Sequence, residues 1–335
     1  MILAGDVGGT KTHLGYVSFD KSDRQLVADW QTPTGSYPSF EALLEAFLAK
    51  HRMPIDAACF GMAAPVVDGC SQKTNLPWAV DFRPLQRLLG AEAVWLINDL
   101  EATGYGVLTL RSDEIAVLQA GKLQPKGMLA VLAAGTSLGD ATLIWEHGFY
   151  RAFPSEGGHA DFAPRTPTEW ALHQFLAKLH AGHVSTARVV SGQGLVNIYR
   201  FLTETSSADT PASEPIDPSA TDAAATICAH GLAGRSTRAE KALDLFASAY
   251  GAAAGNLALR ALPSAGLYLG GGIAPKMLSK LEDGAFMQAF AEKGRLKGLL
   301  SEIPVRVILN QQAAPFGAAY HAHARRALSS NSAYS

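Results

Sequence analysis

The hydrophobic and polar positions of the first hundred residues alternate between the patterns of strands and of helices. Apolar runs of strand length occur at residues 2–6, 13–18, 25–30, 57–65 and 93–99. Helical spacing of apolar positions occurs at residues 38–51, at 82–90 and from about residue 99. Because strands that alternate with helices usually form a sheet covered by helices, this part of the chain predicts an α/β fold.

A similar opening recurs later in the chain. Residues 128–145 give an apolar run, a Gly-Thr turn and a second apolar run, as residues 2–19 do. Residues 148–154 have the pattern of a third strand. We interpret this recurrence as an internal duplication. It predicts two similar lobes with a cleft between them, each lobe offering a glycine-threonine hairpin turn to that cleft.

Helical patterns dominate residues 167–262. Within them, residues 240–262 are rich in Ala and Gly, which allows close packing between helices. A stretch rich in Ser, Thr, Pro and Asp interrupts the helices at residues 204–220 and predicts a surface loop.

The last part of the chain returns to alternation. Residues 265–278 predict a strand, a triple-glycine turn and a helix with Pro275 in its first turn. A strand at 303–309 then leads into a helix from about Pro315. We expect a small α/β lobe at 1–110 completed by a C-terminal helix at 312–327, a large α/β lobe with helical insertions at 111–311, and a disordered tail at 328–335.

The composition excludes several classes of protein. With 28 Lys and Arg against 30 Asp and Glu, the chain lacks the basic surface that nucleic-acid backbones require. No apolar run approaches the roughly 18 residues of a membrane span, and no secretory signal is visible at the start. Cys59, Cys70 and Cys228 have the spacing of neither a zinc site nor a disulfide framework. We therefore expect a cytoplasmic protein without nucleic-acid or membrane partners.

The turn after the first strand carries candidate chemistry, because an acid precedes its glycines. Gly8 and Gly9 let a backbone approach an anion, and the Thr10 hydroxyl adds a donor. Asp6 would repel bare phosphate but suits phosphate that arrives with Mg²⁺. A plain tight hairpin explains the glycines equally well.

Two further glycine turns bear on this choice. Gly135 and Thr136 stand at the matching place in the repeat, as a grip on polyphosphate from both sides would require. The run Gly270–Gly272 lies at a strand-to-helix turn, where a base and ribose can lie against the backbone. A tight connection that needs small residues is the alternative for that run.

Polar residues also cluster where the strand at 93–99 meets a helix. Asn98 is a favoured N-cap, and Glu101 three residues later completes a capping-box pattern. Asp99 has no task in that pattern beyond complementing the helix dipole. The functional alternative makes Asp99 a general base that accepts a hydroxyl proton during phosphoryl transfer.

Glu156 and His159 flank two glycines in a loop, so they do not form a metal-binding helix motif. Their residue types suit hydrogen bonds to adjacent sugar hydroxyls. A surface turn with a satisfied histidine is the alternative.

Taken in order, these stretches resemble the bacterial glucokinase family of the hexokinase and actin-like ATPase superfamily, whose lobes are RNase H-like. "GDVGGTK" and "AAGTSLGDA" are similar to its two phosphate motifs, "INDLEATGYG" to the segment with its catalytic aspartate, and "SEGGHADFAP" to a further family segment. The resemblance extends from residue 2 to about residue 325. The cysteine-rich zinc motif of the related ROK sugar kinases is missing.

The resemblance implies a role for each matching position. Asp99 would be the catalytic base. The implied sugar ligands are Asn98, Asp99, Glu156 and His159. Asp6 would support Mg²⁺ through a water molecule. The implied nucleotide-binding residues are Gly5, Asp6, Val7, Gly8, Gly9, Thr10, Gly135, Thr136, Gly270, Gly271 and Gly272.

Three positions depart from the family pattern. Ala187 stands where the family typically has a glutamate that binds sugar hydroxyls, which is worth about 1.5–3 kcal/mol. Ser137 replaces a usual glycine and Gln193 a usual proline, and we expect little effect from either.

The expected function is transfer of the ATP γ-phosphoryl group to a hexose, with the 6-hydroxyl of glucose as acceptor. A kinase of another hexose or amino sugar, and a non-catalytic sugar or nucleotide sensor on the same fold, are the alternatives. The resemblance also implies a homodimer.

Overall fold

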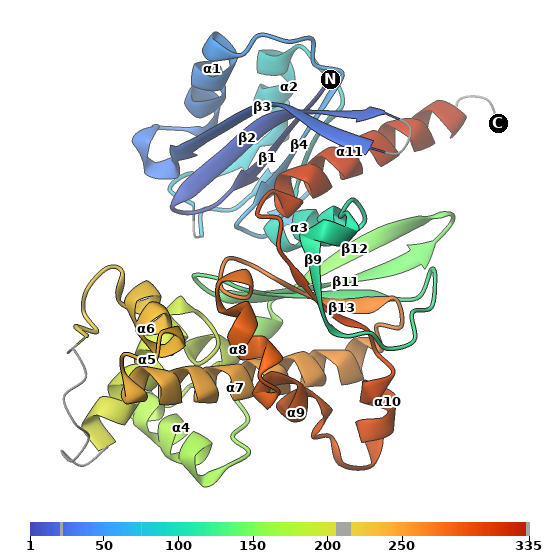
Figure 1. Ribbon diagram of the computed structural model, residues 1–335. Helices are drawn as coiled ribbons and strands as arrows, with labels where there is room; N and C mark the ends of the chain where they lie inside the picture. The colour runs from blue at the N-terminus through green and yellow to red at the C-terminus, as the bar shows by residue number, and fades with distance from the viewer. Residues whose placement is uncertain (21–22, 75, 206–215, 333–335) are drawn as a thin grey trace. The chain divides into compact units, whose positions relative to one another are not determined.

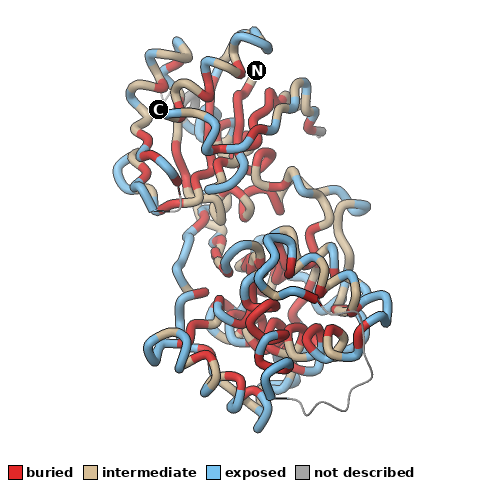
Figure 2. Tube along the Cα trace, turned by 90° about the vertical axis from the view of Figure 1, so that its left-hand side faces the viewer, coloured by how far each residue is buried: buried red, intermediate tan, exposed pale blue. Residues whose placement is uncertain are grey.

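The computed structural model describes residues 1–20, 23–74, 76–205 and 216–332, and the chain divides into two compact units. Unit 1 contains residues 1–114, 152–154 and the C-terminal segment from Asn310. Unit 2 contains residues 115–151 and 155–309. In each unit the buried residues follow the central strands and the helix faces that cover them (Figure 2).

Unit 1 is built on a five-stranded sheet in the order β3-β2-β1-β4-β8. Its strands are β1 (Ile2–Val7), β2 (Lys11–Asp20), β3 (Asp23–Pro33), β4 (Ala57–Met62) and β8 (Val94–Asn98). β1, β4 and β8 run parallel to one another, whereas β2 is antiparallel to both β1 and β3. β4 is buried at every position, as expected of a central parallel strand that is covered on both faces.

Helices cover both faces of this sheet (Figure 1). They are α1 (Phe40–Lys50), α2 (Phe82–Leu89), α3 (Asp99–Val107) and α11 (Ala313–Ser332). α1 begins at the Ser39 N-cap and buries Phe40, Leu43 and Phe47 in one core with Leu3 of β1. On the other face, α11 packs against α3, β1 and β4.

Unit 2 repeats this topology. Its six-stranded sheet has the order β12-β11-β10-β13-β14-β9, and β10, β13 and β14 are parallel as β1, β4 and β8 are. The strands are β9 (Ile115–Gln119), β10 (Leu129–Ala134), β11 (Leu138–Glu146), β12 (Phe149–Ser155), β13 (Gly266–Gly270) and β14 (Val305–Ile308). The predicted duplication and α/β class are confirmed, and β9 is an antiparallel addition that the pattern did not indicate.

Most helices of unit 2 lie between β12 and β13 in the chain. The helices are α4 (Pro167–Leu179), α5 (Gly192–Thr205), α6 (Ala223–Leu232), α7 (Thr237–Ala261), α8 (Leu278–Glu282), α9 (Ala285–Ala291) and α10 (Lys297–Ser301). A Cβ added at Gly251 would lie 2.1 Å from the Phe286 backbone oxygen of α9. The small residues of α7 therefore allow the close helix packing that the sequence predicts.

Several short elements complete the chain. The 3-10 turns are η1 (Thr34–Ser36), η2 (Ser112–Glu114), η3 (Gly157–His159), η4 (Thr186–Arg188), η5 (Pro275–Met277) and η6 (Gly294–Leu296). A small antiparallel sheet in unit 1, which was not predicted, consists of β5 (Val66–Val67), β6 (Cys70–Ser71) and β7 (Val80–Asp81). Within the described residues, no helix is both long and apolar enough to cross a membrane.

Two boundary predictions need comment. The disordered tail expected at 328–335 is wrong for 328–332, because α11 continues to Ser332. No Gly or Pro follows Ala327 to stop the helix, and residues 333–335 lie outside the described part. Of the loop expected at 204–220, Glu204 and Thr205 still belong to α5, and 206–215 are outside the described residues.

Candidate functional site

The turn between β1 and β2 is held from behind and exposed at its tip. The Gly8 N–H donates to the Lys11 oxygen (3.0 Å), and Thr34 Oγ1 donates to the Gly8 oxygen (2.6 Å). Gly9 and Thr10 are exposed, and their N–H groups have no acceptor within the described part of the chain. A fixed turn with outward N–H groups is suited to binding an anion.

Asp6 precedes this turn in β1, directly opposite His13 of β2. His13 is already paired with Asp29, whereas the Asp6 carboxylate has no hydrogen bond or ion pair to another described residue. Burial raises the Asp6 pKa from 3.8 to about 6. A carboxylate that is desolvated without a partner is stabilised by a cation that arrives with a ligand, so this position fits Mg²⁺.

Gly5 and Val7 are placed differently from the rest of the motif. Both are buried in β1, and a Cβ added at Gly5 would lie 2.4 Å from Leu14 Cδ2. They pack the strand that carries the turn, so only Asp6 and residues 8–10 present groups to a ligand.

The start of α3 forms the capping box that the sequence offers as one alternative. Asn98 Oδ1 accepts from the Leu100 N–H (2.8 Å), and the Glu101 carboxylate accepts from the Asn98 N–H (2.9 Å). Asp99 Oδ1 also accepts from the Leu100 N–H (2.9 Å). Asn98 Nδ2 has only a long contact to the Ala64 oxygen (3.4 Å), which leaves its amide N–H₂ as a donor for a ligand.

The sheet brings Asp6 and Asp99 to one edge. In the parallel register Asp6 pairs with Gly61, and Met62 pairs with Asn98. Asp6 lies in β1 and Asp99 directly follows β8, and only β4 separates these two strands, so β1 and β8 lie two strand spacings apart, roughly 10 Å. The carboxyl edge of parallel strands is where α/β sheets bind ligands.

In unit 2, the matching turn lies between β10 and β11. The Gly135 N–H donates to the Ser137 oxygen (2.8 Å), and the Gly135 oxygen accepts from the Gly192 N–H at the start of α5 (2.9 Å). Thr136 and Ser137 are exposed. The N-terminal end of a 14-residue helix thus adjoins this turn and adds to its preference for negative charge.

The triple-glycine turn has a packing role at its middle residue. Gly271 has φ +78°, and a Cβ there would lie 2.2 Å from the Ala134 oxygen at the end of β10. This confirms the tight-connection alternative for Gly271. Contact of Gly270 or Gly272 with a nucleotide stays a prediction.

Glu156 directly precedes η3 and His159 is its last residue, with 3.9 Å between Glu156 Oε2 and His159 Nε2. Both side chains are mostly exposed, at 72% and 64%. Behind them, Ser155 Oγ donates to buried Asp140 (2.8 Å) and accepts from the Gly157 N–H (2.9 Å). Burial raises the Asp140 pKa. The sequence pattern did not single out this buried support for the loop.

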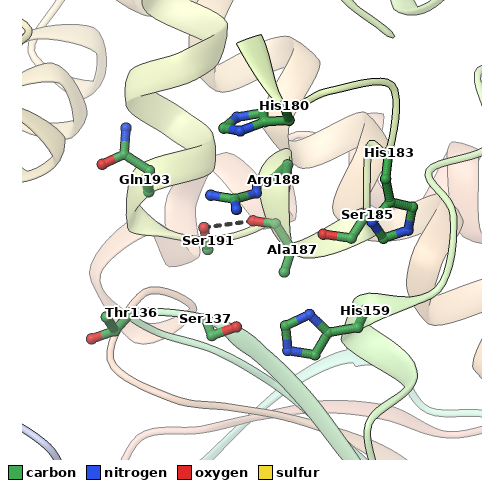
Figure 3. Close-up of a pocket in the computed structure, with 10 residues that line it drawn as sticks. All are labelled: Thr136, Ser137, His159, His180, His183, Ser185, Ala187, Arg188, Ser191 and Gln193. Atoms are coloured by element: carbon green, nitrogen blue, oxygen red, sulfur yellow. Dashed lines mark hydrogen bonds between the residues drawn. The ribbon is translucent and has the colours of Figure 1, made fainter. Parts of the chain in front are cut away.

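A pocket of about 340 Å³ opens in unit 2 between the second turn and the end of α4 (Figure 3). Its lining residues are Thr136, Ser137, His159, His180, His183, Ser185, Ala187, Arg188, Ser191 and Gln193. Of the predicted site residues it brings together Thr136 and His159. His180, His183 and Arg188 were not predicted; their only sequence signal is the cluster of basic residue types within 180–188.

Among the described residues, no group of three or more His, Cys, Asp or Glu side chains is placed so that it could hold a metal ion. The candidate residues form two sets. Unit 1 holds Asp6, the turn at 8–10, Asn98 and Asp99, and unit 2 holds the turn at 135–137, the glycine run, Glu156 and His159.

Comparison with known proteins gives a consistent result. The sequence matches the family model described as Glucokinase over residues 3–325. A glucokinase of a Nostoc species is 42% identical over 339 residues, covering 95% of this chain and 98% of the relative. A glucokinase of Cronobacter sakazakii is 33% identical, covering 95% and 96% respectively.

Solved structures give the same fold. A glucokinase from an Antarctic psychrotroph has a TM-score of 0.82 at 27% identity and covers 96% of this chain and 98% of its own. A Balamuthia mandrillaris glucokinase in complex with glucose has a TM-score of 0.79 at 22% identity, covering 96% and 93%. The resemblance seen in the motifs is thus confirmed over nearly the whole length, and the chain belongs to the glucokinase family.

Proposed function

We propose that this protein transfers the γ-phosphoryl group of ATP to the 6-hydroxyl of glucose, with Asp99 as the general base. The observation that carries the proposal is the shared sheet edge in unit 1. There a phosphate-type turn, an unpartnered carboxylate and a carboxylate at a helix start stand together. Among structural relatives, a ROK glucokinase from Streptomyces griseus was solved with glucose and AMPPNP.

In the proposed reaction, a bond forms between the sugar O6 and the γ-phosphorus. The bond between that phosphorus and the β–γ bridging oxygen breaks, and ADP leaves. Asp99 accepts the hydroxyl proton as the new bond forms. The capping box made by Asn98 and Glu101 fixes the backbone of Asp99, so the base is already oriented before the sugar binds.

Sugar binding is assigned to Asn98, Asp99, Glu156 and His159. Asn98 contributes through Nδ2, because its Oδ1 is occupied by the helix cap. Glu156 and His159 offer an acceptor and a donor that can serve neighbouring hydroxyls, and their exposure leaves both accessible.

Nucleotide binding is assigned to residues 8–10, to Gly135 and Thr136, and to Gly270 and Gly272. Outward N–H groups of the first turn would bind phosphate oxygens. Asp6 would hold Mg²⁺ through water. Mg²⁺, when bound with ATP, neutralises charge on the β- and γ-phosphates. At a pKa of about 6, Asp6 is mostly ionised at neutral pH, as this role requires.

A kinase of another hexose is the second candidate, and Ala187 favours it. Ala187 is 8% exposed in the pocket wall and offers a methyl group where a hydroxyl acceptor would bind glucose. Membership of the glucokinase family does not favour the remaining alternative, a non-catalytic sugar or nucleotide sensor.

The test is a coupled ADP-release assay across a panel of hexoses, on the natural protein and on Asp99→Asn. We expect sugar-dependent turnover with glucose, and a kcat about 10²- to 10⁴-fold lower for the variant because its amide cannot accept the proton. Near-normal turnover of Asp99→Asn would show that Asp99 is not the general base. ADP release that does not depend on sugar would contradict the assignment as a sugar kinase.

Two further expectations belong to this proposal. A cytoplasmic location agrees with an ATP-consuming reaction and with three free cysteines, Cys59, Cys70 and Cys228. A homodimer stays a prediction that sedimentation velocity can check.

A further inference from the structure

Every residue that lines the unit 2 pocket except Ala187 has a polar side chain that can donate a hydrogen bond, and none is a carboxylate. Three histidines and Arg188 share the wall with hydroxyl and amide side chains, and no Asp or Glu is among the lining residues. Glu156 faces His159 and Asp161 faces His183 (3.3 Å) from outside this lining. Neither carboxylate is paired with Arg188.

Arg188 is the one Lys or Arg residue of this lining. Its side chain is exposed and makes no ion pair or hydrogen bond with another described residue. Only its backbone is used: the N–H donates to the Ser185 oxygen (3.0 Å), and the oxygen accepts from Asn197 Nδ2 (2.9 Å). A guanidinium presents a planar fork that matches the oxygens of a phosphate or carboxylate. Without a protein partner, this fork is available to a ligand.

His180 adds a second open position at the end of α4. Its Nε2 is buried and has no hydrogen-bond partner in the described structure. The pKa of His180 is lowered by burial and by the charge of Arg188, so the two side chains belong to one electrostatic environment. An unsatisfied buried nitrogen costs free energy unless a ligand meets it.

The two sides of the pocket differ in chemistry. In Figure 3, Thr136, Ser137 and His159 lie on one side, His180 and Arg188 lie on the other, and the Ala187 methyl group is between them. Because the turn at Thr136 is assigned to phosphate, the hydroxyl that is phosphorylated faces that side. The opposite end of the sugar ring then faces Arg188 and His180.

We propose that this enzyme accepts hexoses that carry an anionic group on the end of the ring opposite the phosphorylated hydroxyl, with Arg188 and His180 binding the anion. The inference rests on the proposed function and names its substrate class. The transfer itself is unchanged: the free 6-hydroxyl receives the γ-phosphoryl group, Asp99 takes the proton, and ADP and a doubly phosphorylated sugar leave when the anion is a phosphate.

The probe is glucose 1-phosphate, which has its anion on that end and a free 6-hydroxyl, and methyl glucoside is its neutral counterpart. Calorimetry without ATP measures binding to the natural protein, to Arg188→Gln and to Arg200→Gln. Arg200 is an exposed cation of α5 that does not line the pocket, so its variant is the matched control. Arg188→Lys keeps the charge but loses the fork.

We expect glucose 1-phosphate to bind more tightly than methyl glucoside. Arg188→Gln should weaken this binding about 10- to 100-fold, Arg188→Lys should fall between, and Arg200→Gln should match the natural protein. With ATP, glucose 1-phosphate should give ADP and a bisphosphate.

Equal binding of the charged and neutral sugars would overturn the inference, as would binding that does not depend on Arg188. Inorganic phosphate that binds at Arg188 while glucose 1-phosphate is not phosphorylated would also overturn it. Turnover of glucose itself separates the two proposals. If glucose is phosphorylated but glucose 1-phosphate is not bound through Arg188, the kinase assignment stands and only the anion-site inference is wrong. Loss of turnover with every sugar removes the kinase itself.

Discussion

Asn98 shows how one side chain contributes to both fold and site. Its Oδ1 caps α3, which is the structural alternative drawn from the sequence, and its Nδ2 is left as a donor for a ligand. Gly271 also has a packing reason at its place, through its positive φ and its approach to Ala134. Residue types alone left both choices open, because an asparagine suits both a helix cap and a ligand, and a glycine suits both a tight connection and a bound nucleotide.

The roles of Asp140, His180 and Arg188 in the site could not be predicted from the sequence. Asp140 supports the loop at 155–159 only because β11 passes behind that loop. His180 and Arg188 come from the end of α4 and from η4, and their open positions exist only once these segments meet. Such roles depend on burial and on partners, which residue spacing does not define.

Asp6 links stability to pH at the residue scale. Its pKa is raised from 3.8 to about 6, so the folded protein binds this proton more strongly than the unfolded chain does. The cost of burying the charge is therefore fully present above pH 6 and is relieved as the pH falls toward 3.8. We expect Asp6→Asn to raise Tm at pH 7.5, on the order of a few °C, and to lose kinase activity.

Thermal unfolding between pH 4.5 and 7.5 checks this prediction, and the gain from Asp6→Asn should shrink at the lower pH. Asp113→Asn, at an exposed carboxylate of the same unit, is the control and should show neither effect. An Asp6→Asn protein that is less stable at pH 7.5 would mean that the carboxylate is not destabilising there.

At the element scale, long periodic segments were predicted well and short ones were not. Buried strands such as β4 and β8 have enough consecutive apolar residues to define them. β5, β6 and β7 have two residues each, too few for any periodicity. The antiparallel edge strand β9 is only partly buried, so its pattern resembles that of a loop.

The contact between α3 and α11 gives a prediction at this scale. A Cβ added at Gly317 of α11 would lie 1.8 Å from the Ala102 oxygen of α3. Gly317→Ala should therefore push apart two helices, one of which begins at Asp99. We expect a loss of about 1–3 kcal/mol in the free energy of unfolding, together with a lower kcat.

Gly298→Ala in α10 is the matched control, because a Cβ there meets nothing within 4 Å. This change should be neutral, or stabilising by up to about 1 kcal/mol, since alanine favours helix. Denaturant unfolding and the ADP-release assay measure both variants. If Gly317→Ala and Gly298→Ala had the same free energy of unfolding and the same kcat, α3 and α11 would accommodate the added methyl group without loss of stability.

At the scale of the whole molecule, the duplication explains why each unit presents a glycine turn. The strand orders β3-β2-β1-β4-β8 and β12-β11-β10-β13-β14 are equivalent, so the two turns occupy equivalent places in their sheets. This much followed from the sequence, because both repeats keep the order of apolar run, turn and apolar run. Register and helix packing had to come from the structure.

Ligand binding gives a prediction at this scale. A ligand present at 100 times its Kd stabilises the folded protein by about 2.7 kcal/mol. We expect glucose and Mg·ATP each to raise Tm, and Asp6→Asn to reduce only the rise caused by Mg·ATP. A thermal-shift series with each ligand measures this, and equal loss of both rises would contradict separate nucleotide and sugar residues.

The position of α11 in the chain has a consequence for biosynthesis. All strands of the unit 1 sheet lie within the first 98 residues, yet the helix that covers β1, β4 and α3 begins only at Ala313 and is translated after the whole of unit 2. On the ribosome, the nascent chain therefore exposes the apolar surfaces of β1, β4 and α3 that α11 later covers, next to Asp99 at the start of α3. The enzyme can become competent only after α11 has been translated, and chains cut short before Ala313 should be targets for chaperones and proteases.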